Sequence, residues 1–150
     1  MKMMRIFTRK QYEVVRALGE VLYPEGGAIP YSAHEVGVPE FMDDYVADLD
    51  KAKQGLIKKL LFLLEWGPIL FLRKARRFTR LSLNERVDFL TWMEKSRFYF
   101  IRICLVSIRT LIGMGYMADA RVLKSIGYFK NNPYPGDPRP IEIREVKHAG

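Results

Sequence analysis

Few side chains in this sequence could take part in catalysis. The 150 residues include two histidines, His34 and His148, and one cysteine, Cys104. Hydrolytic and zinc chemistry need nucleophilic or metal-binding groups at fixed spacings, as in H-E-x-x-H, paired Cys and His ligands, or G-x-S-x-G. None of these motifs occurs in the chain. Because Cys104 stands among apolar residues, we expect a buried structural thiol there. We therefore predict that the chain is not an enzyme and that it holds no catalytic residue, metal ion or cofactor.

One glycine motif matches the consensus of a dinucleotide-binding loop. The segment 113–118, Gly-Met-Gly-Tyr-Met-Ala, fits G-x-G-x-x-A. That loop binds phosphate only when a strand precedes it and a helix follows it. A long helical pattern precedes it here, so we predict a helix-to-helix connection rather than a cofactor site.

Three carboxylates lie close together at Asp43, Asp44 and Asp48. Carboxylate groups of this kind can bind a hard cation when they converge on one point. On a helix, however, positions i, i+1 and i+5 do not converge on one face. We therefore predict that the three residues form a solvated helix face.

The net charge of +8 is unevenly distributed along the chain. Residues 13–50 carry nine acids and one arginine, whereas residues 51–80 carry nine bases and one glutamate. The bases in 73–80 could contact phosphate groups of a nucleic acid or an anionic membrane. A solvated connector, or a contact with the acidic block, is the alternative that we favour. A basic binding module for anionic membrane or nucleic acid remains our second functional hypothesis.

We predict a single helix over about residues 82–113, which contains the most apolar part of the sequence. Ser82 and Glu85 form an S-x-x-E capping box at its start, and the apolar positions beyond residue 96 are too many for a surface helix. We therefore expect this helix to be central and covered on most sides. Polar residues recur every seven positions along it, at Asp88, Lys95, Arg102 and Arg109. Arg102 and Arg109 are predicted either to lie on a solvated edge or to meet a carboxylate of this chain or of a partner.

The other helix signals indicate an all-α, single helical-bundle domain over residues 1–128. Thr8 with Gln11 opens a first helix, Pro39 begins a second, and Asp119 caps a last short one. A helix from about 51 to 66 is expected to break or kink at Gly67-Pro68. Residues 129–150 contain four prolines and are predicted to form an extended tail.

No export signal or membrane span is expected from the residues themselves. Met1 to Thr8 lacks the apolar run of a signal peptide. The run Leu56 to Leu72 contains three charged residues and the Gly-Pro break, whereas a span needs about 20 largely uncharged residues. We therefore predict no transmembrane segment.

Several short motifs together resemble a known family, over about residues 7–130. They are Leu22-Tyr23-Pro24, Val38-Pro39-Glu40-Phe41, Asp43-Asp44, Arg77-Phe78-Thr79-Arg80-Leu81-Ser82, Arg86, Trp92, Ser96, Arg102, Gly115-Tyr116, Asp119, Val122 and Ile126-Gly127-Tyr128. The pattern resembles the gluconate 2-dehydrogenase subunit 3 family, the gamma or small subunit of membrane-associated sugar and alcohol dehydrogenases. It is also similar to the N-terminal helical region of long-chain fatty alcohol oxidases.

The resemblance implies a non-catalytic accessory subunit. Its partner would be a FAD-dependent flavoprotein of the glucose-methanol-choline (GMC) oxidoreductase type, and a cytochrome c subunit is a further candidate for the complex. FAD is expected in the partner and not in this chain. Members often carry a twin-arginine export signal, which this sequence lacks, so the location stays open between cytoplasm and periplasm.

The end of the chain, from Tyr128 into the predicted tail, supplies the remaining candidates for partner binding. Fixing each backbone residue costs about 1–2 kcal/mol, and a partner that buries the aromatic rings could offset this. We therefore predict that Tyr128, Phe129 and Tyr134 contact the partner, together with Arg102 and Arg109.

Overall fold

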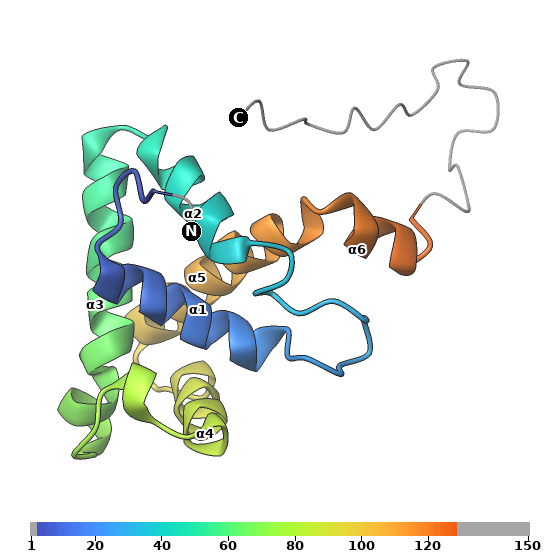
Figure 1. Ribbon diagram of the computed structural model, residues 1–150. Helices are drawn as coiled ribbons and strands as arrows, with labels where there is room; N and C mark the ends of the chain where they lie inside the picture. The colour runs from blue at the N-terminus through green and yellow to red at the C-terminus, as the bar shows by residue number, and fades with distance from the viewer. Residues whose placement is uncertain (1–2, 129–150) are drawn as a thin grey trace.

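The computed structural model describes residues 3–128, which form a bundle of α-helices (Figure 1). The elements are α1 (Arg9–Leu22), α2 (Val38–Ala47), α3 (Lys51–Leu72), the short 3-10 helix η1 (Phe78–Arg80), α4 (Leu83–Glu94), α5 (Tyr99–Met117) and α6 (Ala120–Ser125). This described part contains no strand, so the all-α prediction is confirmed. The predicted tail, 129–150, lies outside the described residues.

The helices α1, α4 and α6 begin where the capping residues predict. The Thr8 hydroxyl accepts the Gln11 N–H at 3.3 Å, and the Gln11 side chain accepts the Thr8 N–H at 2.9 Å. Ser82 and Glu85 make the same reciprocal pair at the start of α4. Asp119 caps α6 by accepting the Arg121 N–H at 2.8 Å. These contacts link residues two or three positions apart, which is why sequence alone locates them.

The predicted single helix over 82–113 is wrong: two helices occupy this stretch, and residues 95–98 separate them. Ser96 is buried there, and its hydroxyl accepts the N–H of Phe98 at 3.3 Å. The Ser96 carbonyl accepts a hydrogen bond from the Arg102 guanidinium at 2.8 Å. Side-chain hydrogen bonds of this kind compete with the helical backbone pattern. Asp88 and Lys95 therefore do not share one helix face with Arg102 and Arg109.

We predicted a break or a kink at Gly67-Pro68, and the break is wrong, because α3 continues through both residues to Leu72. Proline inside a helix removes one backbone hydrogen bond and normally kinks or ends the helix. Here Gly67 and Pro68 are both buried, and a Cβ on Gly67 would lie 2.5 Å from Phe89 Cζ. The packing of α4 against this point supports the second half of α3, in keeping with the tertiary origin of most helical stability.

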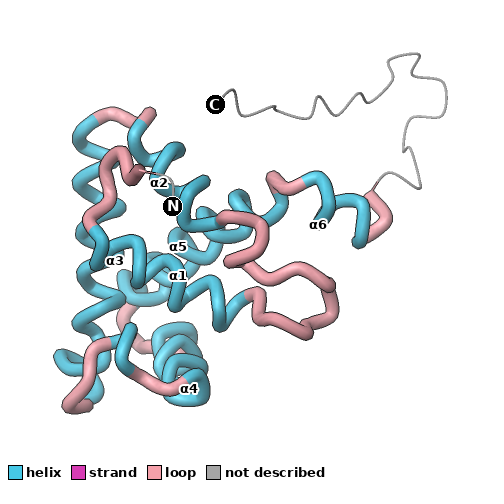
Figure 2. The backbone as a smooth tube through the Cα atoms, in the orientation of Figure 1, coloured by secondary structure: helices cyan, strands magenta, loops and turns pink. Residues whose placement is uncertain are grey.

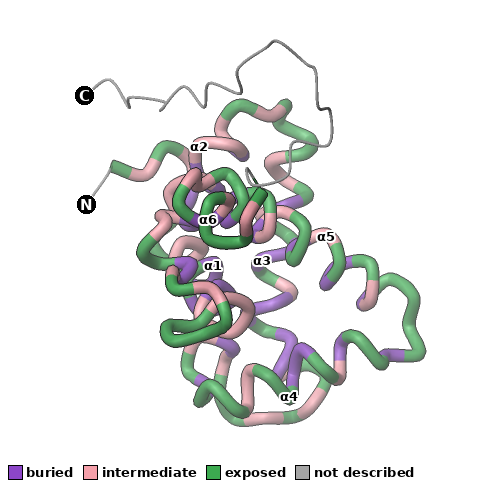
Figure 3. The backbone as a smooth tube through the Cα atoms, turned by 90° about the vertical axis from the view of Figure 1, so that its right-hand side faces the viewer, coloured by how far each residue is buried: buried purple, intermediate pink, exposed green. Residues whose placement is uncertain are grey.

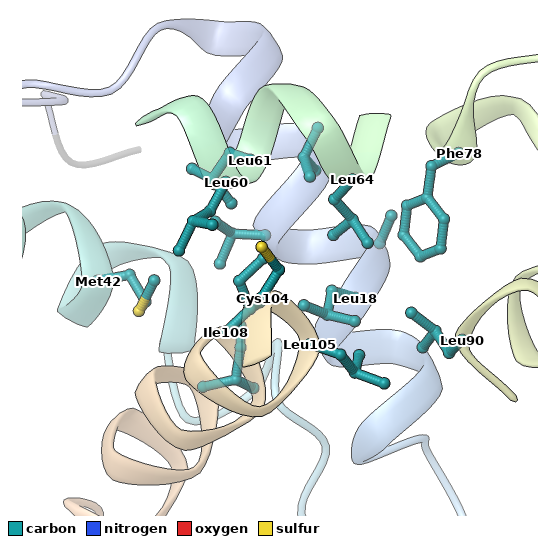
Figure 4. Close-up of a cluster of buried hydrophobic side chains, with 14 of the residues drawn as sticks. Leu18, Met42, Leu60, Leu61, Leu64, Phe78, Leu90, Cys104, Leu105 and Ile108 are labelled. Carbon is teal, nitrogen blue, oxygen red and sulfur yellow. The ribbon is translucent and has the colours of Figure 1, made fainter. Parts of the chain in front are cut away.

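The hydrophobic core lies between α1 and the helices around it. α1 contacts each of α2, α3, α4 and α5, and α5 packs on α2 and α4. Figure 4 shows the buried side chains that meet at this point, among them Leu18 of α1, Leu64 of α3 and Leu105 of α5. Figure 2 shows the long loop that joins α1 to α2. It leaves the bundle on the side of α6, away from α3 (Figure 1).

Candidate partner-binding surface

Asp43 holds the first ordered segment against α2. Its Oδ1 atom accepts the N–H groups of Ile6 at 3.0 Å and Phe7 at 2.7 Å, and its Oδ2 atom accepts the N–H of Arg5. Burial acts to raise the pKa of Asp43, but these hydrogen bonds to the charged form outweigh burial and lower the pKa below its usual value. The prediction that Asp43 belongs to a solvated face is therefore wrong, since the residue is 4% exposed.

A second polar cluster joins η1 to α1, α3 and α4. Glu65, which is buried in α3, accepts hydrogen bonds from the Thr79 N–H at 3.1 Å and the Thr79 hydroxyl at 2.8 Å. The guanidinium of Arg86 donates to the carbonyls of Phe78 and Thr79 and to the Glu20 carboxylate, the last at 2.7 Å. The motif around residues 77–82 thus serves to tie three helices together.

A third cluster joins the loop between α1 and α2 to α5. The ring of Tyr116 stacks on Tyr23 with centroids 3.8 Å apart, and its hydroxyl donates to the Tyr31 carbonyl at 2.6 Å. Burial raises the pKa of Tyr116. A Cβ on Gly115 would lie 2.8 Å from Phe41 Cδ1, so glycine permits α2 to approach α5. Both Gly113 and Gly115 lie inside α5, which continues to Met117. The predicted helix-to-helix connection at this motif is therefore wrong.

The polar side chains in the interior are engaged in these structural roles. Within residues 3–128, every buried side-chain nitrogen or oxygen has a hydrogen-bond partner, and no three His, Cys, Asp or Glu side chains gather as metal ligands would. Cys104 is buried, as predicted, and burial raises the pKa of its thiol. His34 is exposed in the loop between α1 and α2. The candidate binding residues are therefore to be sought among the exposed side chains.

The basic connector also pairs locally. Arg77 Nε lies 3.7 Å from the Glu65 carboxylate, and Lys74 Nζ lies 3.5 Å from the Glu85 carboxylate. Both acids lie outside the acidic block of residues 13–50. The guanidinium of Arg77 also lies over the Trp66 ring, 5.5 Å from its centroid. These two bases thus serve to hold the connector on α3 and α4.

The largest unexpected feature of the surface is an apolar face on α5. Buried and exposed positions both occur along this helix (Figure 3), and its exposed apolar residues lie between Tyr99 and Val106 and again at Met114 and Met117. We define the outer face of α5 as the exposed apolar residues Tyr99, Ile103, Val106, Met114 and Met117, with Phe98 and Phe100 at its N-terminal end. Phe98, Tyr99 and Phe100 are 70%, 68% and 65% exposed. The prediction that this helix is covered on most sides is wrong.

The outer face of α5 escaped the sequence interpretation because composition shows that a helix is apolar but does not show which neighbours cover it. A signal was nevertheless present. Positions 99, 103, 106, 110, 113 and 117 alternate in steps of four and three, which places them on one face of a helix. Only the positions of the other helices decide that this face stays open.

The structure places the predicted partner-binding residues as follows. The Arg102 guanidinium donates to the Ser96 carbonyl and lies 5.6 Å from the centroid of the Tyr99 ring. Arg109 lies 3.8 Å from the Glu94 carboxylate, with half of its side chain exposed. Both arginines border one flank of the outer face of α5. Tyr128 follows α6 and is 61% exposed. Phe129 and Tyr134 lie outside the described residues.

α5 is also long and apolar enough to cross a membrane, judged by length and composition alone. The sequence analysis weighed only Leu56 to Leu72 as a possible membrane span, whereas among the described residues the helix that meets the criterion is α5. Core helices of globular proteins meet the same criterion, and part of the most apolar stretch of α5 is buried in this fold. The length and composition of α5 therefore do not by themselves identify it as a membrane-spanning helix.

Comparison with known proteins identifies the family. A family model described as gluconate 2-dehydrogenase subunit 3 matches residues 9–136, which include all six helices. No curated protein and no solved structure matches the chain significantly. The family description is that of a subunit of a dehydrogenase complex. Because the match covers most of the sequence, the chain belongs to the gluconate 2-dehydrogenase subunit 3 family.

Proposed function

We propose that this chain is a non-catalytic accessory subunit that binds and stabilises a FAD-dependent catalytic subunit of the GMC type. The observation that carries the proposal is the outer face of α5, in a chain whose family is defined by a dehydrogenase subunit. Proteins that act alone seldom leave a long apolar face in water, and such faces commonly mark protein interfaces. The FAD belongs to the partner in this proposal.

The interior of the domain fits a scaffold role. Asp43 and Glu65 accept hydrogen bonds from backbone N–H groups of this chain, and Arg86 donates to backbone carbonyls. Such contacts hold helices in fixed relative positions, which preserves the shape of a binding surface. The proposed contacts to the catalytic subunit are the outer face of α5 with Arg102 and Arg109, and, from the end of the chain, Tyr128, Phe129 and Tyr134.

The experiment is co-expression of the chain with the flavoprotein encoded nearest to it, with the flavoprotein alone as the control. We expect co-purification as a complex, with more soluble flavoprotein and more flavin absorbance per mole than in the control. An equal yield of flavin-loaded protein without this chain, and no complex on size exclusion, would refute the accessory role. Alcohol or sugar oxidation by this chain alone would refute its non-catalytic nature.

A further inference from the structure

The spacing of the outer face of α5 suits one helical partner. Positions 99, 103, 106, 110, 113 and 117 follow the alternation of four and three that aligns a helix with a second helix along a seam. From residue 99 to residue 117 the seam runs for about 27 Å at 1.5 Å per residue. A partner helix of similar length could therefore pack along all of it.

The middle of this seam carries only small residues, Thr110 and Gly113, and has no unsatisfied polar group. The Thr110 hydroxyl donates to the Val106 carbonyl at 2.8 Å, so it needs no partner from outside. Gly113 has no side chain of its own, and a Cβ there would lie 3.4 Å from the Tyr23 hydroxyl oxygen, so Tyr23 borders the seam at this point. The larger residues, Tyr99 and Ile103 at one end and Met117 at the other, stand on either side of this section of small residues.

The charges beside the seam indicate the chemistry of the partner. α5 contains no Asp or Glu, and its charged residues are Arg102 and Arg109, seven positions apart on the same flank. The exposed ion pair of Arg109 with Glu94 is long, at 3.8 Å, and pairs of this kind contribute little. Arg109 is thus available to exchange partners, while Arg102 is already oriented by the Ser96 carbonyl and the Tyr99 ring.

We propose that the outer face of α5 binds an amphipathic helix of the catalytic subunit, whose apolar seam is flanked by carboxylates that pair with Arg102 and Arg109. This inference rests on the proposed function and names the surface and partner chemistry that carry it out. Opposite charges beside an apolar seam select both the partner and its register.

Two other occupants fit the face less well. A second copy of the chain would bring two seams together that each carry two arginines and no carboxylate, and like charges at such positions are destabilising. A helix that lies on a membrane surface has a charged side opposite its apolar side. The side of α5 opposite the outer face is instead the hydrophobic core, with Ile101, Leu105 and Ile108 buried.

The test compares two double variants in complex formation with the catalytic subunit. Ile103→Asp with Val106→Asp places charges in the seam. Leu56→Asp with Phe62→Asp is the control, because Leu56 and Phe62 are apolar residues of α3 that are 55% and 61% exposed, against 40% for Ile103 and 57% for Val106. We expect the seam variant to bind at least tenfold more weakly and the control to bind like the natural chain. Circular dichroism melting of each variant alone verifies the fold.

Two substitutions of Arg109 test whether carboxylates flank the seam of the partner helix. Arg109→Glu should weaken binding severalfold, and Arg109→Lys should retain most of the affinity because it keeps the positive charge. We also expect the affinity of the natural chain to fall with rising salt, and the affinity of Arg109→Glu to fall less.

The outcomes separate the inference from the function on which it rests. If the natural chain forms no complex with the catalytic subunit, the proposed function fails, and the inference fails with it. If the chain binds but the folded seam variant binds equally well, the inference alone is overturned. It is also overturned if the seam variant loses binding to phosphatidylglycerol–phosphatidylcholine vesicles, or loses a dimer that the natural chain forms.

Discussion

Asp43 shows how one buried carboxylate can organise a chain terminus. It is placed on α2, yet its hydrogen bonds reach backbone groups 36 to 38 positions earlier. Burying a charge is costly unless hydrogen bonds compensate for the lost water, and here three N–H groups do so. The exposed neighbour Asp48 contacts the Arg5 guanidinium at 3.1 Å and provides a natural comparison.

Replacing Asp43 by Asn should lower the free energy of unfolding by about 1–3 kcal/mol at pH 7. An amide has only one oxygen, so an NH₂ group would face an N–H donor of Arg5–Phe7. Urea denaturation monitored by circular dichroism measures the effect. Asp48→Asn is the control and should change stability by less than about 1 kcal/mol. Equal effects of the two substitutions would contradict the anchoring role of Asp43.

The same residue makes stability depend on pH. Because the pKa of Asp43 is lowered in the folded state, its stabilising contribution is fully present above the unfolded pKa of about 3.9. It is lost as the pH falls through the lower pKa of the folded state. Unfolding free energies between pH 7 and pH 2 should therefore fall less steeply in Asp43→Asn than in the natural chain. Parallel curves would show that Asp43 does not titrate as described.

At the scale of the elements, α3 shows packing that overrides a local helix breaker. Gly67 lies where α4 approaches α3, and the Phe89 ring that meets it is 1% exposed and contacts Phe78 and Trp92. Gly55 lies in the same helix with no atom within 4 Å of the position a Cβ would take. The two glycines lie in the same helix but differ in their surroundings. Substituting each by alanine therefore distinguishes the effect of helix propensity from the effect of packing.

Gly55→Ala should raise the free energy of unfolding by about 0.5–1 kcal/mol, because alanine favours the helix over glycine. Gly67→Ala should instead lower it by about 1–3 kcal/mol, since the new methyl group would meet Phe89 Cζ at 2.5 Å inside a filled core. Thermal and urea unfolding of both variants give the comparison. Stabilisation by Gly67→Ala would mean that Phe89 does not pack there.

At the scale of the whole molecule, the domain separates a structural interior from an exterior that carries the proposed partner contacts. The core contains side chains from α1, α2, α3, α4 and α5, whereas the outer face of α5 and the end of the chain beyond α6 remain as candidate contacts. In a complex, two contacts on one partner reinforce each other, because the second contact forms at a high effective concentration. The end of the chain can therefore be tested separately from α5.

Truncation after Tyr128 should leave the helical content and the melting temperature of the isolated chain almost unchanged, because the described core lies before this point. It should reduce the yield of soluble, flavin-loaded partner on co-expression. Circular dichroism and flavin absorbance of the purified complex measure the two effects. A truncated chain that unfolds would place the tail in the core. An unchanged partner yield would leave α5 as the contact to pursue.

Features that depend on near neighbours along the chain could be predicted from the amino-acid sequence. Thr8 with Gln11, Ser82 with Glu85 and Asp119 define helix starts through contacts within three residues. These local signals, with the helical spacing of apolar residues, were enough for the all-α class. The short motifs, in their order, were enough for the family.

Features that depend on residues far apart in the sequence required the three-dimensional structure. The passage of α3 through Pro68 and the burial of Asp43 each depend on a contact with another segment, and local propensity does not contain that information. The open face of α5 depends in the same way on where α2 and α4 pack. An apolar helix has the same sequence pattern whether one side or every side is covered, so the candidate binding surface became visible only when the helices were placed around it.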